Sequence, residues 1–278
     1  MHPLRVARHY GRLAIRRAFP TPEEAAWRRL LERAERFPEI GRHEERLLDL
    51  VVRFPDAGAV ASQWHDIFVR NALCLSLATE APRVIDCGAH IGLATLWIKR
   101  RWPRARVTAF EADPEIAETL AINLTRNKAH DVEVVPAAVW THTGTVRFRS
   151  TGTDAGALDA VAADTGGSPG EVRSERLRDW LTEPIDLLKV DIEGAELDVL
   201  MDSADRLHLV RNIHLEVHDF DPTRRLLPRS LLTLEQAGFA YALGDVSHPM
   251  WRAGVGAAGP FPTAVPSWIA VIRAWRTE

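Results

Sequence analysis

The sequence contains little cysteine and no long apolar run. Its 278 residues include only two cysteines, Cys74 and Cys87, which are too few for a disulfide scaffold, so we expect the reducing cytoplasm as its compartment. No apolar stretch approaches the roughly 18 residues that a transmembrane helix needs, so no transmembrane segment is predicted. A formal net charge of −3 gives no global reason to expect a nucleic-acid partner.

The first 80 residues differ from the rest in the secondary structure that their sequence pattern predicts, and we predict a domain boundary between residues 80 and 81. Residues 1–20 contain five arginines and no acidic residue. Such a segment is typical of a frayed extension or of a surface helix that docks on the protein, on an anionic membrane or on a second copy. A helical extension follows, because good helix formers are frequent in segments 23–36, 44–52 and 62–78. These N-terminal helices are the interface that we expect for a homodimer.

Residues 81–278 alternate between strand-like and helix-like segments. Strands are predicted at residues 84–87, 106–112, 132–139, 145–150, 185–192 and 212–218, with an antiparallel pair at 241–246 and 267–275. Helices are predicted at 93–101, from Asp113-Pro114 onward and at 193–204. This alternation predicts a mostly parallel sheet with helices on both faces. The segment 151–170, rich in glycine and alanine, is expected to be a long loop.

The turn after the first predicted strand has the sequence VIDCGAHIG, residues 84–92. Its pattern, acid-x-Gly-x-x-x-Gly, is not the G-x-G-x-x-G turn of most dinucleotide sites. A bare backbone at Gly88 lets a ligand approach the carboxyl edge of the sheet, and Gly92 lets the following helix pack closely. Asp86 would repel a phosphate and suits a ligand with an amino group or a positive charge.

A second acid, Glu111, ends the second predicted strand, 23 residues beyond Gly88. An acid at this place can accept hydrogen bonds from both hydroxyls of a ribose. A nucleoside that carries a cationic tail and no phosphate matches S-adenosylmethionine, which is the cofactor that we predict.

Further acids follow two later strands. Asp191 ends a buried strand in KVDIEGAE, residues 189–196, where Glu196 and to a lesser extent Glu193 fit helix capping. In IHLEVH, residues 213–218, Glu216 and His218 fall at the carboxyl edge and lie beside Asp191 if the two strands are neighbours. His214 is interpreted as a core histidine.

These motifs together resemble the FkbM family of S-adenosylmethionine-dependent methyltransferases. The resemblance covers about half of the chain and depends on VIDCGAHIG (84–92), AFEADPE (109–115), AINLTRN (121–127), PAAVW (136–140), LLKVDIEGAELDVL (187–200) and IHLEVH (213–218). It implies a class I methyltransferase Rossmann-like α/β fold, with a mostly parallel seven-stranded sheet after the N-terminal helical extension. It also implies methyl transfer, usually to oxygen, on a sugar or another secondary metabolite.

The resemblance also assigns site residues. The methionine part of the cofactor would contact Asp86, Gly88, Ala89 and Gly92. The ribose would contact Glu111, the adenine would contact Ala112 and Ala138, and Asp191 would lie near the transferred methyl group. Two residues depart from the family pattern, because His90 stands where Asn is common and Ala112 where Pro is common; His90 is therefore also a candidate for substrate contact.

The acceptor hydroxyl must lose a proton, and we expect Glu216 or His218 as the general base, with His90 as a second candidate. Asp191 and Glu216 also resemble the carboxylates with which other class I O-methyltransferases hold Mg²⁺, an ion that lowers the pKa of a hydroxyl. The alternative is that these carboxylates only form hydrogen bonds to cofactor or substrate.

Two other functions stay open. The first is an NAD(P)-dependent oxidoreductase, which would explain the fold and Glu111 but would need phosphate-binding glycines that the sequence lacks. The second is a non-catalytic nucleoside-binding module, which would not need the acids that the sequence retains at the strand ends. Nucleic-acid methylation is disfavoured by the absence of an Asn-Pro-Pro-Tyr-like motif and of a basic and aromatic stripe. The small-molecule hydroxyl acceptor is expected to contact segments 21–80, 151–170 and 247–266. Trp251 in the last of these would stack on the acceptor or anchor the loop.

Overall fold

The computed structural model describes residues 20–37, 40–73, 75–151, 156–158, 168–219, 224–247 and 268–277. The basic segment 1–19 lies outside the described residues, as do most of the predicted loop 151–170 and the segment 248–267 with His248, Trp251 and Phe261. The chain divides into two compact units, Met1–Cys74 and Leu75–Glu278.

The N-terminal unit contains both helices and a β-hairpin. Its elements are helix α2 (Pro22–Arg36), strands β1 (His43–Leu47) and β2 (Leu50–Phe54), helix α3 (Ala57–Trp64) and the π-helix η1 (His65–Val69). Thr21 caps α2, since its hydroxyl accepts a hydrogen bond from the Glu24 N–H and the Glu24 carboxylate accepts one from the Thr21 N–H.

The predicted helix at 44–52 is wrong, because this segment forms the antiparallel hairpin β1–β2. The chain reverses at Leu48, whose φ of 57° lies in the left-handed region. In β2 every second side chain is buried, Leu50, Val52 and Phe54, a period of two that suits a strand with one covered face. The predicted helix at 62–78 is also too long, because η1 ends at Val69 and Asn71 has a φ of 54°.

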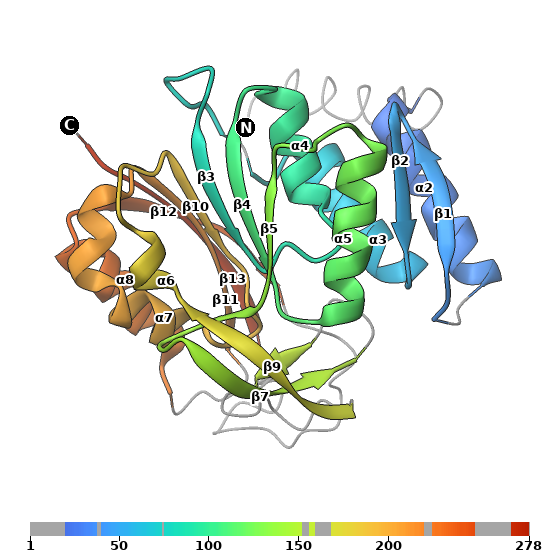
Figure 1. The fold of residues 1–278 in the computed structure, drawn as a ribbon. Coiled ribbons are helices and arrows are strands. Elements are labelled where there is room, and N and C mark those ends of the chain that lie inside the picture. The colour runs from blue at the N-terminus through green and yellow to red at the C-terminus, as the bar shows by residue number, and fades with distance from the viewer. Residues whose placement is uncertain are drawn as a thin grey trace, which may run out of the picture. The chain divides into compact units, whose positions relative to one another are not determined.

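The second unit is built on a seven-stranded sheet with the order β12-β13-β11-β10-β3-β4-β5 (Figure 1). Its strands are β3 (Arg83–Cys87), β4 (Arg106–Glu111), β5 (Glu133–Pro136), β10 (Leu187–Val190), β11 (Asn212–Asp219), β12 (Ala240–Ser247) and β13 (Trp268–Trp275). β13 is antiparallel to both of its neighbours, and all other pairs are parallel. The predicted fold class is confirmed: a class I methyltransferase, Rossmann-like α/β arrangement.

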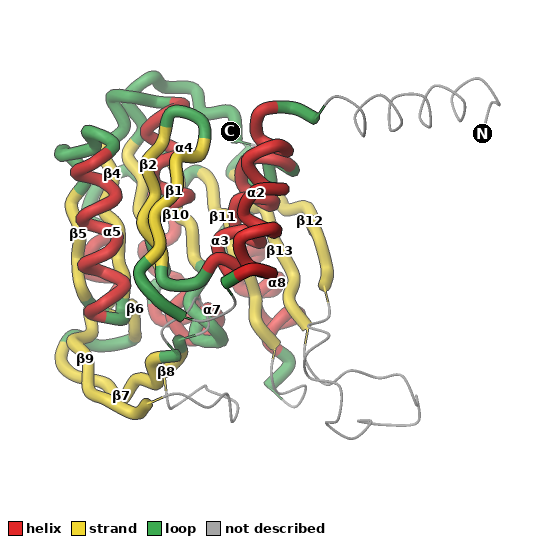
Figure 2. The backbone as a smooth tube through the Cα atoms, turned by 90° about the vertical axis from the view of Figure 1, so that its right-hand side faces the viewer, coloured by secondary structure: helices red, strands yellow, loops and turns green. Residues whose placement is uncertain are grey.

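Helices cover both faces of this sheet (Figure 2). They are α4 (Leu93–Arg101), α5 (Pro114–Arg126), α6 (Leu177–Trp180), α7 (Glu196–Asp202), the 3₁₀ helix η2 (Ala204–Leu209) and α8 (Leu226–Gln236). Successive residues of β3 point to opposite faces, so Val84 packs with Ile98 of α4 while Ile85 belongs to the cluster that includes Leu197 of α7 and Leu234 of α8. The strands bury mostly apolar side chains, and polar residues gather toward the carboxyl edge of the sheet, in the strands and in the turns that follow them.

A second, four-stranded sheet follows β5 and has the order β6-β9-β7-β8. Its strands are β6 (Ala138–Trp140), β7 (Gly144–Ser150), β8 (Ala157–Leu158) and β9 (Ser168–Arg176). The single strand predicted at 132–139 is therefore two strands, which separate at Ala137 and enter different sheets. β8 and the start of β9 lie within the segment that was predicted as a loop, and the strand predicted at 145–150 is confirmed as β7. In Figure 1, β7 and β9 lie beyond the end at which β5 stops.

Candidate functional site

The turn between β3 and α4 has a left-handed backbone at three of its residues, Gly88, His90 and Gly92, with φ values of 77°, 49° and 93°. A Cβ atom at Gly88 would lie 1.8 Å from the backbone oxygen of Asp191, and one at Gly92 would lie 2.6 Å from Cδ1 of Leu120. Gly92 thus allows the close helix packing that was expected. Gly88 is required first by the close approach of the chain after β10, a contact that the sequence did not indicate.

Glu111, at the end of β4, is fixed against this turn by two backbone donors. Its Oε2 accepts a hydrogen bond from the His90 N–H at 2.8 Å, and its Oε1 accepts one from the Asp113 N–H at 2.9 Å. Burial raises the pKa of Glu111 to about 7, because it disfavours the ionised carboxylate, and the backbone donors offset only part of this effect. The carboxylate therefore has a set position beside the glycine turn and remains partly accessible.

The two alanines that the resemblance assigns to adenine lie in one apolar cluster, although Ala112 follows β4 and Ala138 begins β6 of the other sheet. Ala138 of β6 is buried in this cluster, and Ala112 packs against it together with Ile192. Ala112 directly follows Glu111, so this apolar surface adjoins the carboxylate.

Asp86 is fully buried in β3 and has two partners. The Thr95 hydroxyl donates a hydrogen bond to its Oδ2 at 2.7 Å, and Lys189 Nζ lies 3.2 Å from its Oδ1. Lys189 also donates hydrogen bonds to the Gly88 carbonyl oxygen at 3.1 Å and to Asp191 Oδ2 at 3.3 Å. Asp86 is thus linked to the turn through Lys189, which contacts both Asp86 and the Gly88 carbonyl oxygen.

Lys189 is the site residue that sequence reasoning missed. Burial by itself lowers the pKa of this lysine. The carboxylates of Asp86, Asp191 and Glu216 raise the pKa by more than burial lowers it, so it lies above its ordinary value and the side chain is a cation. The signal was present in the sequence: a lysine in the strand LLKV, whose four residues are all buried. A buried charge needs partners, and here these are the carboxylates of two strand ends.

The segment between β10 and α7 forms a tight turn. Glu193 and Gly194 have φ values of 55° and 97°, so the predicted helix start at Glu193 is wrong and α7 begins at Glu196. Glu196 is fully buried, and its Oε1 accepts hydrogen bonds from the N–H groups of Ile192 at 3.2 Å and Gly194 at 3.0 Å. The turn places a carboxylate oxygen of Glu193 within 4.8 Å of one of Asp191.

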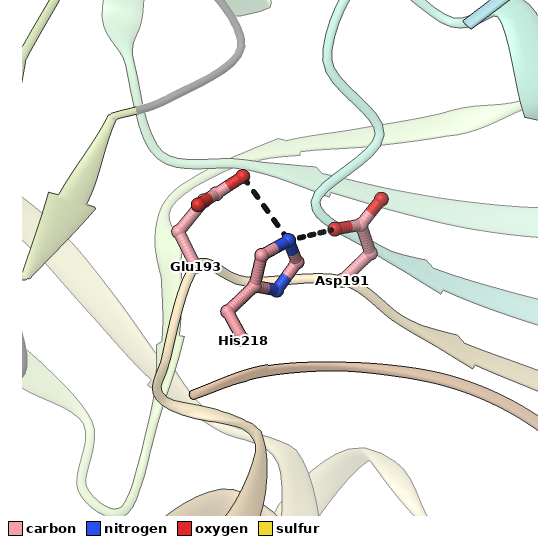
Figure 3. Close-up of side chains that lie close together, drawn as sticks. All are labelled: Asp191, Glu193 and His218. Atoms are coloured by element: carbon pink, nitrogen blue, oxygen red, sulfur yellow. Dashed lines mark ion pairs between the residues drawn. The ribbon is translucent and has the colours of Figure 1, made fainter. Parts of the chain in front are cut away.

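His218 of β11 lies among these acids (Figure 3). Its side chain is 4% exposed, with Nδ1 at 2.9 Å from Glu196 Oε1. Its Nε2 lies 3.5 Å from Glu193 Oε1, 3.8 Å from Glu216 Oε1 and 3.9 Å from Asp191 Oδ1. Burial lowers the pKa of His218, but Glu193, Glu196 and Glu216 outweigh it and raise the pKa well above the ordinary value.

The expected neighbourhood of Asp191, Glu216 and His218 is present, because β10 and β11 are adjacent and parallel. His214, on the same strand, lies opposite Lys189 in the sheet. Burial lowers its pKa to about 4, with further contributions from Lys189 and Arg273, so it is a neutral core residue, as interpreted from the sequence.

No helix in the described part of the chain is both long and apolar enough to cross a membrane.

Known proteins with similar sequences support one family. The model of the Methyltransferase FkbM domain matches residues 86–241, more than half of the chain. Methyltransferase sdnD of Sordaria araneosa is 29% identical over 212 residues, which cover 63% of this chain and 80% of that protein. The 2-O-methyltransferase NoeI of Sinorhizobium fredii is 27% identical over 176 residues, which cover 55% of this chain and 70% of that protein. A part of the AMB antimetabolite synthetase AmbE of Pseudomonas aeruginosa, 8% of its length, is 32% identical to 49% of this chain.

Proposed function

The chain belongs to the FkbM methyltransferase family, and from this premise we propose that it transfers a methyl group from S-adenosylmethionine to a hydroxyl oxygen of a small molecule. The observation that carries the proposal is the position of Glu111. Its carboxylate is held between the glycine turn and the start of α5 by the backbone N–H groups of His90 and Asp113. These two bonds leave further lone pairs for the two hydroxyls of a ribose.

The other residues around Glu111 fit the remaining parts of this cofactor. The apolar cluster with Ala112 and Ala138 suits an adenine ring, and the half-buried backbone at Gly88 suits the methionine part. The acids at the carboxyl edge of β10 and β11 provide a negative field for a sulfonium cation, and Asp191, directly after β10, belongs to them. When bound, S-adenosylmethionine supplies an electrophilic methyl group on a positively charged sulfur.

The protein must orient the acceptor oxygen in line with the carbon–sulfur bond and must take up its proton. The new oxygen–carbon bond forms as the carbon–sulfur bond breaks, and the bonding electrons stay on the sulfur. The raised pKa of His218 disfavours it as the base, because the neighbouring carboxylates favour the protonated ring. We therefore assign the proton to Glu216 of β11, whose side chain is 30% exposed.

Calorimetry with S-adenosylmethionine, its demethylated product and NAD tests the cofactor. We expect both sulfur nucleosides to bind and NAD not to bind. Glu111→Gln should weaken S-adenosylmethionine binding at least tenfold, whereas Glu115→Gln, an exposed acid in the first turn of α5, should not change it. Tight binding of NAD, or equal affinities in both variants, would contradict the proposal. Binding without turnover on any acceptor would leave the non-catalytic nucleoside-binding module.

The acceptor is proposed to be a hydroxylated small molecule such as a sugar or another secondary metabolite, and the similar protein NoeI is a 2-O-methyltransferase by name. A screen of glycosides, polyketides and phenolics with labelled methyl donor tests this class. Hydroxyl products are expected, and labelled amines alone would overturn the assignment to oxygen. We retain the cytoplasm as compartment, because the chain has two cysteines and Cys87 is free and buried.

A further inference from the structure

Several acidic side chains gather around His218 and Lys189. The contacts described above connect five carboxylates with two cations: Asp86, Asp191, Glu193, Glu196 and Glu216 with Lys189 and His218. A cluster of carboxylates that are partly or fully buried is suited to holding cations.

Three donor atoms in this cluster are arranged so that one ion can contact all of them. The ligand atoms of Asp191, Glu193 and His218 all lie within 4.8 Å of one another. At metal–ligand distances of about 2.1 Å, neighbouring ligands lie roughly 3.0 to 3.4 Å apart. The observed 3.5 Å and 3.9 Å from His218 Nε2 to the two carboxylates need only small side-chain movements to reach these values.

The orientation of the imidazole is independent support for an ion. A histidine that binds a metal through one nitrogen usually donates the N–H of the other nitrogen to a carboxylate, which fixes the ring. His218 has this arrangement, because its Nδ1 lies 2.9 Å from the fully buried Glu196 and its Nε2 is directed toward Glu193 and Asp191 (Figure 3). Glu196 is in turn held by the backbone N–H of Gly194.

We propose that Asp191, Glu193 and His218 bind a divalent transition-metal ion of the Mn²⁺ type at the carboxyl edge of β10 and β11, and that the ion displaces the proton from His218 Nε2, which is released to solvent, while Nδ1 stays on Glu196. An imidazole nitrogen together with two carboxylates is a ligand set that Mn²⁺, Fe²⁺, Co²⁺ and Zn²⁺ accept, while Mg²⁺ prefers oxygen ligands only. The set differs from the pair predicted from the sequence in using Glu193 and His218 beside Asp191. A role of the ion at the acceptor hydroxyl rests on the proposed function, but its binding does not.

Mn²⁺ is the probe, used with tag-free protein that has been treated with chelator. In a titration followed by electron paramagnetic resonance, the signal of free Mn²⁺ should fall until one ion is bound per chain. Pulsed spectra of the bound ion should show ¹⁴N coupling from the imidazole. His218→Gln should abolish this coupling and raise the Kd at least tenfold, while Glu193→Gln should raise the Kd similarly and retain the coupling. Mg²⁺ should displace Mn²⁺ only at tenfold or higher excess.

Asp66→Asn is the matched control, because Asp66 Oδ1 also lies 3.4 Å from a histidine nitrogen, that of His65, but is not part of the cluster. Its Kd for Mn²⁺ should equal that of the wild type. The proposal is overturned if the wild type binds no Mn²⁺ at millimolar concentration, if bound Mn²⁺ shows no ¹⁴N coupling, or if all three variants bind equally. The wild-type spectrum decides the question even if a site variant fails to fold. Calorimetry of S-adenosylmethionine without metal tests the proposed function separately.

Discussion

Exchanging Glu111 for glutamine should change the pH dependence of stability in a defined direction. Burial raises the pKa of Glu111 from 4.5 to about 7, so the folded protein holds this proton more tightly than the unfolded chain does. The stability that Glu111 contributes through its proton is therefore fully present below pH 4.5 and is lost as the pH rises through about 7. Glutamine does not ionise, so the variant lacks this loss.

The size of the effect follows from the pKa difference. At about 1.4 kcal/mol for each tenfold change in proton affinity, the wild type loses about 2.5 kcal/mol between pH 5 and pH 8 as an upper limit. Glu111 keeps some contact with solvent, which reduces the expected loss to roughly 1–2 kcal/mol. Glutamine has one acceptor oxygen, so either the His90 or the Asp113 N–H loses its partner, at a cost of about 1–3 kcal/mol at every pH. The diagnostic quantity is therefore the change with pH, not the difference at one pH.

Urea unfolding of the wild type, Glu111→Gln and Glu115→Gln at several values from pH 5 to pH 8 measures this quantity. The free energy of unfolding of Glu111→Gln should increase relative to that of the wild type as the pH rises. That of Glu115→Gln should show the same pH dependence as the wild type. Calorimetry near pH 7, in buffers with different ionisation enthalpies, should also show that the wild type releases more protons on binding S-adenosylmethionine than the variant does. A stability difference that is constant across this pH range would refute the reasoning.

Three further predictions concern residues of the sheet and its turn. Gly88→Ala should destabilise the protein by on the order of 3 kcal/mol or more, because its Cβ would lie 1.8 Å from a backbone oxygen, whereas Gly170→Ala, with nothing within 4 Å, should stay within about 0.5 kcal/mol in thermal unfolding. Lys189→Met should cost about 3–5 kcal/mol in urea unfolding by leaving the buried carboxylate of Asp86 unbalanced, and adding Asp86→Asn should recover part of this loss. The pKa of His214 is lowered from 6.5 to about 4, so its contribution to stability is lost as the pH falls below 6.5; His214→Leu should remove about 2 kcal/mol of the destabilisation between pH 7 and pH 5. Unchanged acid sensitivity in this variant would contradict the assignment of a neutral, buried ring.

The central sheet could be predicted because its signals are local. Buried parallel strands such as β10 have continuous apolar runs, and helix signals such as Asp113 and Pro114 mark where each strand ends. Segments with ambiguous local signals were predicted less well. His43–Phe54 contains many good helix formers, yet a left-handed turn at Leu48 and the burial of alternate residues in β2 make it a hairpin. The break at Ala137 depends on a second sheet whose other strands lie elsewhere in the sequence.

The site was predicted in outline because the carboxyl ends of adjacent parallel strands meet at one edge, which brings Asp191, directly after β10, near Glu216 and His218 of β11. Its electrostatics could not be predicted in this way, since they depend on pairs that are far apart in sequence. His218 fits a general base when its neighbours are unknown. Contact with Glu193 and Glu196 raises the pKa of His218, which is why we propose Glu216 as the general base instead.

Glycine at position 88 is required for a reason that the motif did not indicate. Its pattern was interpreted through the ligand, but the atom that excludes a side chain is the backbone oxygen of Asp191, about a hundred residues later in the chain. Lys189 joins the same two segments, because it donates hydrogen bonds to the Gly88 carbonyl oxygen and to the Asp191 carboxylate. The glycine turn and the acidic turn therefore form one structural unit, and a substitution at Gly88 disturbs both. Loss of cofactor binding in such a variant would report on this unit, whereas Glu111→Gln, which leaves the crossing intact, separates ligand recognition from the fold.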